Sequence, residues 1–484
     1  MKLATRNQAT FLRTDLARAL AQEAFSDSLE HRIDQLPLEF RPKNSSRTRC
    51  CIYKDRAILR YRLMALLGHA VENEQDETRS LASYAKETLE YDSPPEASLT
   101  ILDIACSACE GGKHAVTSLC RGCLARPCSA NCPKDAIHFI NGKAHIQPEL
   151  CINCGKCRNV CPYSAIVHQQ VPCEASCPVD AIAKNEEGIA QIHEEKCIHC
   201  GRCSRACPFA AVMERSSLIP VIERLKKNSA IAMIAPSIAG QFPGGLGRII
   251  TALKYLGFSA VMEVAAGAEK TAKHEAQEYL EGEQDRPLGT SCCPAYVQAV
   301  KKHIKDFLPL VSTTPTPLAY TGAEASKRYP NIPRVFIGPC MAKRDEAREQ
   351  KSAEFVLTFE ELGALFLARD IEIETLDESE PDWSAETGKS WEFAVSGGVA
   401  ANVASCLSQQ GREAPPTRFI DGLDRKGINL LRTGASGKLG NGLWEVMACE
   451  GGCLCGPGTV GNPKIARKAL DEVIQNHSPS NDRV

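Results

Sequence analysis

Two stretches of the chain place four cysteines at the same close spacing, and each stretch ends on proline. They read CINCGKCRNVCP at 151–162 and CIHCGRCSRACP at 197–208. Three thiolates held so close in one loop can bind three corners of an iron–sulfur cubane, while the fourth is carried away by the helix that follows the proline. Because such a cluster is closed by thiolates at every iron, the pattern predicts electron transfer rather than bond chemistry.

Length, cysteine content and charge exclude several other classes. With 484 residues and 25 cysteines the chain is too long for a small disulfide scaffold, and structural zinc would need repeated four-ligand modules. The 57 basic and 59 acidic residues give a net charge of −2, which argues against a nucleic-acid partner. No apolar run reaches the ~18 residues of a membrane span. Since no secretory signal is visible either, we expect a cytoplasmic protein without a membrane partner.

The cysteine-rich middle of the chain is duplicated. RPCSANCPKDAI at 126–137 matches VPCEASCPVDAI at 171–182, and the two close-spaced runs match each other, at an offset of 45 to 46 residues. Repetition of one two-cluster unit predicts α+β ferredoxin-like cluster modules.

The sixteen cysteines of this middle can be grouped into four sets of four. The sets are Cys120, Cys123 and Cys128 with Cys161; Cys151, Cys154 and Cys157 with Cys132; Cys197, Cys200 and Cys203 with Cys177; and Cys106 and Cys109 with Cys173 and Cys207. Spacing supports the first three sets, and four complete sets would hold four accessory [4Fe–4S] clusters. The fourth set is a hypothesis, because the chain must return from position 109 to position 173. In the alternative, Cys106 and Cys109 are buried structural thiols.

The C-terminal half alternates apolar segments with helical ones. Segments 230–236, 259–265, 334–339, 354–359, 391–398 and 443–449 read as buried strands, and 247–256 and 268–281 read as helices. This alternation predicts α/β structure with parallel sheet, in which active groups lie just past the C-terminal ends of strands.

Six cysteines form three islands in this half, in TSCCPAY, GPCMAKRDE and MACEGGCLCGPG. Cys292 and Cys293 are neighbours whose side chains point to opposite faces in extended backbone, so one can bind a metal while the other faces a second site. Lys343 follows Cys340 by three residues and brings a positive charge. A ligand set gathered from several strand ends predicts an active-site metal centre.

These three islands resemble, in order, the cluster-binding motifs of [FeFe]-hydrogenases, most closely the divergent branch called group B. The resemblance covers roughly 230–470. It implies that the cluster modules are followed by an α/β catalytic domain with two lobes of parallel sheet flanked by helices. It also implies an H-cluster, in which a [4Fe–4S] cubane is joined to a diiron unit that carries CO, cyanide and an azadithiolate.

The resemblance assigns roles to individual residues. The cubane ligands match Cys293, Cys340, Cys449 and Cys453, the last being the bridge to the diiron unit. Residues around the diiron unit match Ala235, Pro236, Ser237, Phe393 and Met447, and Lys343 matches a lysine that contacts a cyanide. The proton route matches Cys292, Ser312, Glu275, Glu278 and Glu346. For each glutamate taken alone, a solvated helix residue is the alternative interpretation.

Three positions depart from the family pattern. Gly338 stands where members of the family carry methionine, Leu318 stands where they carry glutamine, and Pro457 interrupts a run of glycines. The first two are expected to alter the lining of the diiron pocket without affecting cubane binding.

The resemblance implies reversible oxidation of H2 and reduction of protons as the activity. H2 and protons would be the substrates, a ferredoxin or similar carrier the redox partner, and dedicated maturases the source of the diiron unit. The alternatives are an H2-sensing protein and a non-enzymatic iron–sulfur assembly protein. The presence of Cys292 favours the enzyme, because assembly proteins of this kind lack the proton-passing cysteine.

The expected domains follow the changes in composition along the chain. They are a charged helical N-terminal region (1–98), a duplicated cluster domain (99–215), a catalytic domain (228–475) and a disordered tail (476–484).

Overall fold

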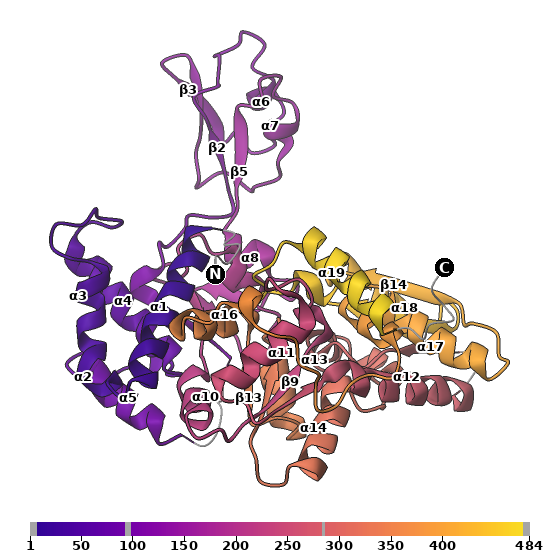
Figure 1. Cartoon of the computed structure of the whole chain (residues 1–484). Helices are drawn as coiled ribbons and strands as arrows, with labels where there is room; N and C mark the ends of the chain where they lie inside the picture. The colour runs from indigo at the N-terminus through magenta and orange to yellow at the C-terminus, as the bar shows by residue number, and fades with distance from the viewer. Residues whose placement is uncertain (1–6, 92–97, 283–285, 478–484) are drawn as a thin grey trace.

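The computed structural model describes residues 7–91, 98–282 and 286–477. It has a broad body, from which one small module stands away (Figure 1). The tail for which disorder is predicted lies outside the described residues from position 478 on. Among the described residues no helix is long and apolar enough to cross a lipid bilayer.

Two parallel sheets form the scaffold of the C-terminal half. The first has the strand order β10 (Ala260–Glu263), β9 (Ile231–Ile234), β12 (Arg334–Ile337) and β13 (Phe355–Leu357). The second has the order β11 (Pro287–Gly289), β15 (Gly442–Met447) and β14 (Thr417–Asp421). Every residue of β9, β10 and β15 is buried, which explains why these strands are nearly continuous apolar runs.

Helices follow most of these strands and pack around the sheets. They are α10 (Leu218–Leu225), α11 (Gly245–Leu256), α12 (Val264–Glu281), α13 (Pro294–His303), α14 (Pro317–Arg328), α15 (Lys343–Gln350), α16 (Phe359–Ala368), α17 (Gly398–Gln409), α18 (Arg425–Ala435) and α19 (Pro463–Asn476). The predicted helices over 247–256 and 268–281 are α11 and α12, each of which begins earlier than expected.

The prediction of a strand over 391–398 is wrong. Gly388–Ala394 forms the 3₁₀-helix η7. Trp391 and Phe393 alternate as strand residues do because they fill two different cores, Trp391 beside α19 and Phe393 beside α17. The apolar pattern also fails to predict β11, which has only three residues, and β14, most of which is exposed.

The cluster region is built from short antiparallel ladders. They pair β1 (Leu99–Ile101) with β8 (Val212–Glu214), β2 (Lys113–Val116) with β5 (Ile166–Gln169), β3 (Ile137–Ile140) with β4 (Lys143–Ile146), and β6 (Ile182–Lys184) with β7 (Ala190–Ile192). Four short helices lie between them: α6 (Pro127–Ala130), α7 (Lys156–Asn159), α8 (Pro172–Ser176) and α9 (Arg202–Ala206). The β2–β5 ladder closes the base of the protruding module, residues 113–169 (Figure 1). The first repeat is therefore inserted into the second.

Five helices form the N-terminal region, and they pack against the body. They are α1 (Gln8–Phe25), α2 (Leu29–Arg32), α3 (Leu36–Phe40), α4 (Ile52–Leu66) and α5 (Leu81–Leu89). One hydrophobic core runs from α1 and α4 into the first parallel sheet.

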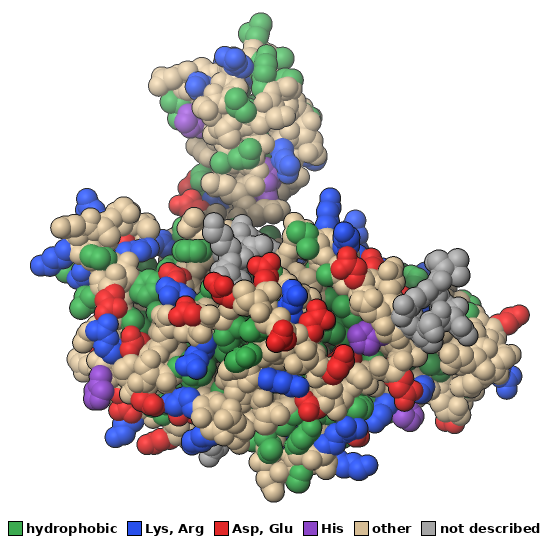
Figure 2. Space-filling view, viewed as in Figure 1, with side chains coloured by type: hydrophobic (Ala, Val, Ile, Leu, Met, Phe, Trp, Pro, Cys, Tyr) green, Lys and Arg blue, Asp and Glu red, His purple; other side chains and the backbone are tan. Residues whose placement is uncertain are grey.

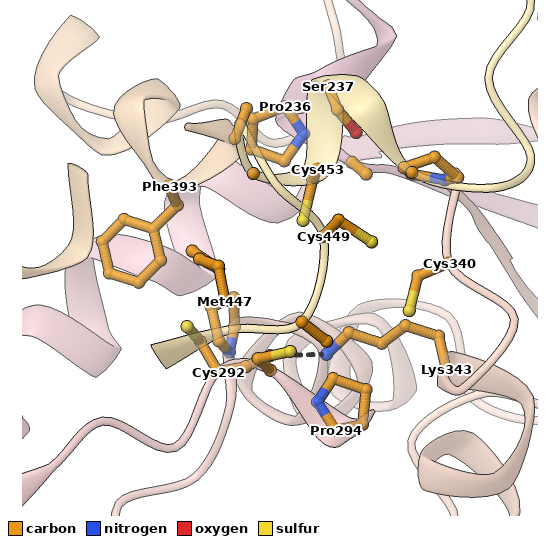
Figure 3. A pocket seen from close by; sticks show the side chains of 18 of the residues that line it. Pro236, Ser237, Cys292, Pro294, Cys340, Lys343, Phe393, Met447, Cys449 and Cys453 are labelled. Atoms are coloured by element: carbon orange, nitrogen blue, oxygen red, sulfur yellow. Dashed lines mark hydrogen bonds between the residues drawn. The ribbon is translucent and has the colours of Figure 1, made fainter. Parts of the chain in front are cut away.

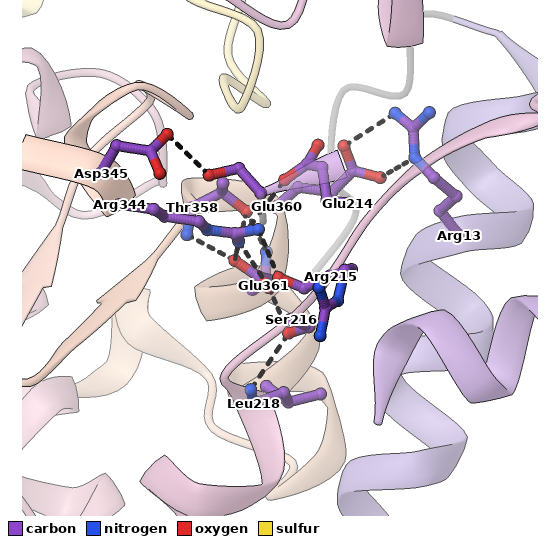
Figure 4. Close-up of polar contacts among 11 residues, drawn as sticks. Arg13, Glu214, Arg215, Ser216, Leu218, Arg344, Asp345, Thr358, Glu360 and Glu361 are labelled. Carbon is purple, nitrogen blue, oxygen red and sulfur yellow. Dashed lines mark hydrogen bonds and ion pairs between the residues drawn. The ribbon is translucent and has the colours of Figure 1, made fainter. Parts of the chain in front are cut away.

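Buried ion pairs reinforce the attachment of the N-terminal helices (Figure 4). Arg13 of α1 donates to both carboxylate oxygens of Glu360 at 3.1 Å. Next to this pair, Arg344 of α15 donates to both oxygens of Glu361 at 2.9 and 3.0 Å. Since removing one partner of such a buried pair leaves an uncompensated charge, these contacts fix α1 and α15 to α16.

Candidate metal centre and proton route

The three cysteine islands of the C-terminal half meet at one cavity (Figure 3). Cys292 and Cys293 lie just after β11, Cys340 just after β12 and Cys449 just after β15. Carboxyl ends of parallel strands share an edge of their sheet. The loops that follow β12 of the first sheet and β11 and β15 of the second sheet all reach the same cavity. The predicted site residues that line the cavity are Ala235, Pro236, Ser237, Cys292, Cys293, Cys340, Lys343, Phe393, Met447, Cys449 and Cys453.

Four thiols of this cavity are buried close enough to influence one another. Burial, and then the thiols of Cys293 and Cys453, raises the pKa of Cys340 well above its ordinary value. Burial, followed by Cys293, raises the pKa of Cys453 to about 12, and burial together with the neighbouring thiols also raises the pKa of Cys449. Such thiols become thiolates together only when a metal centre compensates their charge. The donor set therefore fits an iron–sulfur cubane.

Two polar side chains, Ser237 and Lys343, line the cavity. Ser237, in the 3₁₀ turn after β9, is fully buried, and its Oγ has no hydrogen-bond partner among the described residues. The Lys343 ammonium donates to Glu346 at 2.6 Å and to the Cys292 carbonyl at 3.4 Å. A buried donor without a partner costs free energy, so Ser237 and Lys343 fit a ligand that accepts hydrogen bonds or carries negative charge. Phe393 and Met447 provide an apolar part of the wall (Figure 3).

The two departures from the family pattern have different structural consequences. A Cβ atom on Gly338 would lie 2.6 Å from Cζ of Phe336, whose side chain lines the cavity. The Phe336 ring thus occupies the space that a larger residue at position 338 would need. Leu318 is fully buried at the start of α14, where its neighbour Pro317 lines the cavity instead.

Glu275 of α12 lies directly beside the segment that carries Cys292. It accepts hydrogen bonds from the backbone N–H of Ser291 at 2.8 Å and from the Ser291 hydroxyl at 3.0 Å. Burial raises the pKa of Glu275 to about 7, although these hydrogen bonds act in the opposite direction. A carboxyl with such a pKa can both accept and release a proton near neutral pH.

Ser312 lies beside a second carboxyl nearer the surface. Its hydroxyl donates to Glu278 at 2.5 Å. Ser312 also lies near Glu275 and acts to lower its pKa, but the Glu275 Oε2 has no hydrogen-bond partner among the described residues. Burial acts to raise the pKa of Glu278, but hydrogen bonds from Ser312, Thr313 and Thr314 outweigh it and lower the pKa overall. The structure therefore brings the three predicted groups Glu275, Ser312 and Glu278 together, with a hydrogen bond between Ser312 and Glu278.

Glu346 lies apart from these three groups. It accepts hydrogen bonds from Lys343 at 2.6 Å and from the Thr316 hydroxyl at 2.5 Å. It also lines a second cavity, which Ser291 and Ser312 line as well. Glu346 thus lies between the Lys343 ammonium, which lines the metal cavity, and the second cavity, which Ser291 and Ser312 also line.

Glu445 is a buried carboxyl of the site that the sequence analysis missed. It accepts hydrogen bonds from the backbone N–H groups of Gly397 at 2.7 Å and Ala400 at 2.8 Å, at the start of α17. Burial raises its pKa to about 7, and its charge acts on both Cys292 and Cys453. The signal in the sequence is a glutamate within the buried apolar strand LWEVM.

Each predicted set of accessory cysteines is gathered at one place. Three cavities are lined, respectively, by Cys120, Cys123, Cys128 and Cys161; by Cys132, Cys151, Cys154 and Cys157; and by Cys106, Cys109, Cys173 and Cys207. The remaining set is Cys177, Cys197, Cys200 and Cys203. Burial raises the pKa of the Cys203 thiol well above its ordinary value, and the charges of the other three cysteines raise it further. The β1–β8 ladder explains the set that spacing alone leaves open, because it returns the segment before Cys106 to the segment after Cys207.

Replacing Cys106 and Cys109 by alanine is expected to remove about four iron and four sulfide per chain and to leave the other clusters in place. Iron and sulfide analysis of anaerobically reconstituted protein measures this loss. The matched control replaces Cys50 and Cys51, which lie outside all four sets, and should keep the full iron content. Unchanged iron in the Cys106→Ala, Cys109→Ala protein would assign this pair a purely structural role.

One accessory set adjoins the metal cavity of the C-terminal half. Cys200 lines that cavity together with Cys293 and Cys449. The Arg202 guanidinium of α9 donates to the carbonyl of Ala448 at 2.6 Å, and Arg205 donates to the carbonyl of Pro457. These bonds hold the second repeat against the loop that carries Cys449 and Cys453.

Comparisons with known proteins match the two halves of the chain separately. Residues 228–457 match the family model described as iron only hydrogenase large subunit, C-terminal domain. Residues 120–171 and 168–218 each match the LdpA Fe-S cluster-binding domain. Iron–sulfur binding is therefore supported by independent domain matches as well as by the cysteines.

Three curated relatives are similar over larger parts of the chain. The NADP-reducing hydrogenase subunit HndD of Solidesulfovibrio fructosivorans is 29% identical over 64% of this chain and 56% of its own length. Iron hydrogenase 1 of Clostridium pasteurianum is 27% identical over 47% of each chain. The periplasmic [Fe] hydrogenase large subunit of Nitratidesulfovibrio vulgaris is 28% identical over 70% of this chain and 90% of its own length. The chain thus spans about half the length of the first two relatives.

Proposed function

We propose that the chain, whose residues 228–457 match the model of iron only hydrogenase C-terminal domains, is an [FeFe]-hydrogenase of the divergent group B branch. In this proposal it catalyses the reversible oxidation of H2 and reduction of protons. The observation that carries the proposal is the convergence of four buried thiols, Cys292 and Lys343 on one cavity.

We propose that Cys293, Cys340, Cys449 and Cys453 hold the cubane of an H-cluster in this cavity. When bound, the H-cluster supplies the heterolytic cleavage and formation of H2. The Ser237 hydroxyl and the Lys343 ammonium hold its anionic ligands by hydrogen bonds and charge, and Phe393 and Met447 exclude water. Insertion of the diiron unit requires dedicated maturases.

Protons leave the cavity along side chains of this chain. Cys292 takes a proton at its thiol and passes it toward Glu275, which is buried beside Ser291. Ser312 relays it to Glu278, which is half-buried and ionised at neutral pH because its pKa is lowered. The four exchangeable groups Cys292, Glu275, Ser312 and Glu278 would together carry protons out of a dry site.

Electrons take a separate route through the cluster region, which we assign to 99–215, between a helical region (1–98) and the catalytic domain (228–475). The four cysteine sets hold four [4Fe–4S] clusters in this proposal. The set with Cys200 adjoins the catalytic cavity, the set with Cys106 and Cys173 lies where the protruding module joins the body, and two sets lie within that module.

We propose that the electron carrier docks on the protruding module and is a small acidic protein such as a ferredoxin. Residues 113–169 contain seven Lys or Arg and two Asp or Glu, a net charge of +5 in a chain whose net charge is −2. Apolar side chains beside the cluster cysteines are exposed on it, and Leu124, next to Cys123, is 98% exposed. Figure 2 shows these hydrophobic and basic side chains on the module. A basic surface steers an acidic partner, and exposed apolar side chains provide the contact area.

Reversing two charges of this surface, as Arg121→Glu with Lys156→Glu, is expected to raise the KM for reduced ferredoxin at least about fivefold. Reduction of methyl viologen by H2 should keep its rate, because a small cationic dye needs no docking surface. Steady-state kinetics at two salt concentrations measures both effects. The control Lys426→Glu reverses an exposed charge on α18 of the body and should change neither value. Equal loss of activity with ferredoxin and with viologen would exclude this surface as the docking site.

The activity itself is tested with protein that has been matured anaerobically together with active maturases. We expect H2-dependent reduction of methyl viologen and, in the other direction, evolution of H2 from reduced viologen. A protein with full iron content and complete maturation that shows neither reaction would refute the proposed function.

A further inference from the structure

Arg62 of α4 is a buried cation without a counter-ion among the described residues. Its side chain is 5% exposed, it donates from Nη2 to the carbonyl of Phe209 at 2.9 Å, and its Nε has no partner there. Arg60, two residues earlier on the same helix, forms an ion pair with Glu74 at 2.8 Å. Burying an unpaired charge is costly, so the position of Arg62 indicates that negative charge is present beside it when the protein is complete.

We call the set of Cys106, Cys109, Cys173 and Cys207 the neck set. The cluster that it would bind carries negative charge and is the candidate partner of Arg62. Phe209, whose carbonyl binds Arg62, lies two residues after Cys207. The charge of Cys207 acts on Arg62 and on Arg13. Burial lowers the pKa of Arg62 to about 10, which leaves it protonated at neutral pH.

A third arginine of the N-terminal region, Arg49, contacts the segment that carries Cys106. Arg49 donates to the hydroxyl of Ser107 at 2.7 Å and to the carbonyl of Ala105 at 2.8 Å, on either side of Cys106. Its guanidinium also stacks on the Phe209 ring, 4.9 Å from the ring centroid. Arg62 of α4 and Arg49 of the segment before it therefore place positive charge beside the neck set.

We propose that Arg62 raises the reduction potential of the [4Fe–4S] cluster bound by the neck set. Each electron that enters this cluster adds one negative charge, and a fixed buried cation stabilises the reduced form over the oxidised form. The inference rests on the cluster assignment of the proposed function but not on hydrogenase activity. The neck cluster lies between the clusters of the protruding module and the catalytic cavity, so its reduction potential decides how readily electrons pass. The N-terminal helical region, which carries Arg62, would therefore influence electron transfer.

The test is a redox titration followed by electron paramagnetic resonance on reconstituted full-length protein without the diiron unit. The wave that disappears in the Cys106→Ala, Cys109→Ala protein identifies the neck cluster. In Arg62→Gln this wave should move to a more negative potential, so that its reduced fraction at the wild-type midpoint falls at least about twofold. Arg62→Lys keeps the charge and should restore most of the shift, and the control Arg60→Gln should leave every wave in place.

An unshifted wave in Arg62→Gln, or an equal shift in Arg60→Gln, would overturn the proposal. If Arg62→Gln fails to bind the neck cluster, Arg49→Gln decides instead. It is expected to move the same wave in the same direction by a smaller amount, and no movement would count against the proposal. Because the readout needs no H2 turnover, absence of hydrogenase activity leaves the result interpretable and refutes only the proposed function.

Discussion

Replacing Cys292 by alanine is expected to lower H2 turnover at least about a hundredfold while leaving the cubane of the catalytic cavity in place. The thiol lines the cavity, and burial followed by the charge of Glu275 raises its pKa far above the ordinary value. It therefore stays protonated and can exchange a proton with a bound ligand without becoming a fixed anion. Alanine keeps the backbone and the neighbouring ligand Cys293 but removes the exchangeable proton at this position.

Turnover in both directions, iron content and the cubane spectrum are measured on the same matured preparations. Cys406→Ala is the matched control, because Cys406 is a partly buried thiol of α17 in the same apolar core and lies outside every ligand set. It should keep both turnover and spectrum. Wild-type turnover in Cys292→Ala would show that protons reach the cavity by another path, and loss of the cubane would instead make Cys292 a ligand.

Glu278→Gln is expected to lower turnover by about a hundredfold without changing the spectra of the bound clusters. Glutamine has nearly the same shape and keeps one oxygen that can accept a hydrogen bond from either Ser312 or Thr313, but it cannot carry a proton. The series from Glu275 through Ser312 would then end inside the protein. Turnover is measured with infrared and paramagnetic resonance spectra of the same samples.

Glu281→Gln on the same helix controls for the loss of one acidic group, since Glu281 is exposed and accepts a hydrogen bond from Gln277 at 2.6 Å, one turn earlier on α12. Its turnover should equal that of the wild type. Full activity in Glu278→Gln would remove Glu278 from the proton route. A loss of activity accompanied by altered cluster spectra would point to a structural rather than a proton-carrying role.

Most of what could be predicted about this molecule, its cysteine sets and its buried strands, follows from the local spacing of residues. Three cysteine sets follow from close spacing, because the ligands of an electron-transfer cluster come from short loops. Buried strands such as β12 and β15 follow from their apolar runs, and with them the strand ends at which Cys340 and Cys449 lie. The resemblance to a known family supplied the roles of Cys292, Lys343 and the glutamates, which spacing alone does not reveal.

What could not be predicted depends on long-range pairing. The fourth accessory set requires the β1–β8 ladder, whose strands are separated by the whole inserted module. The sequence of the 3₁₀-helix η7 has the alternating apolar pattern of a strand because Trp391 and Phe393 fill different cores. Phe336 takes the space beside Gly338, and Glu445 meets the start of α17; both result from tertiary packing. The role proposed for Arg62 could not be predicted either, because it depends on the contact of α4 with the carbonyl of Phe209.

The central claim is that the cavity lined by Cys293, Cys340, Cys449 and Cys453 holds an H-cluster. Infrared spectroscopy of anaerobically matured protein tests it most directly, because CO and cyanide bound to iron absorb where protein groups do not. We predict bands from both ligands, shifting when the sample is equilibrated with H2, and weaker or displaced cyanide bands in Lys343→Met. A protein that is fully loaded with iron, was exposed to active maturases and shows no such bands would contradict the account and leave an electron-transfer or assembly protein with a cubane alone.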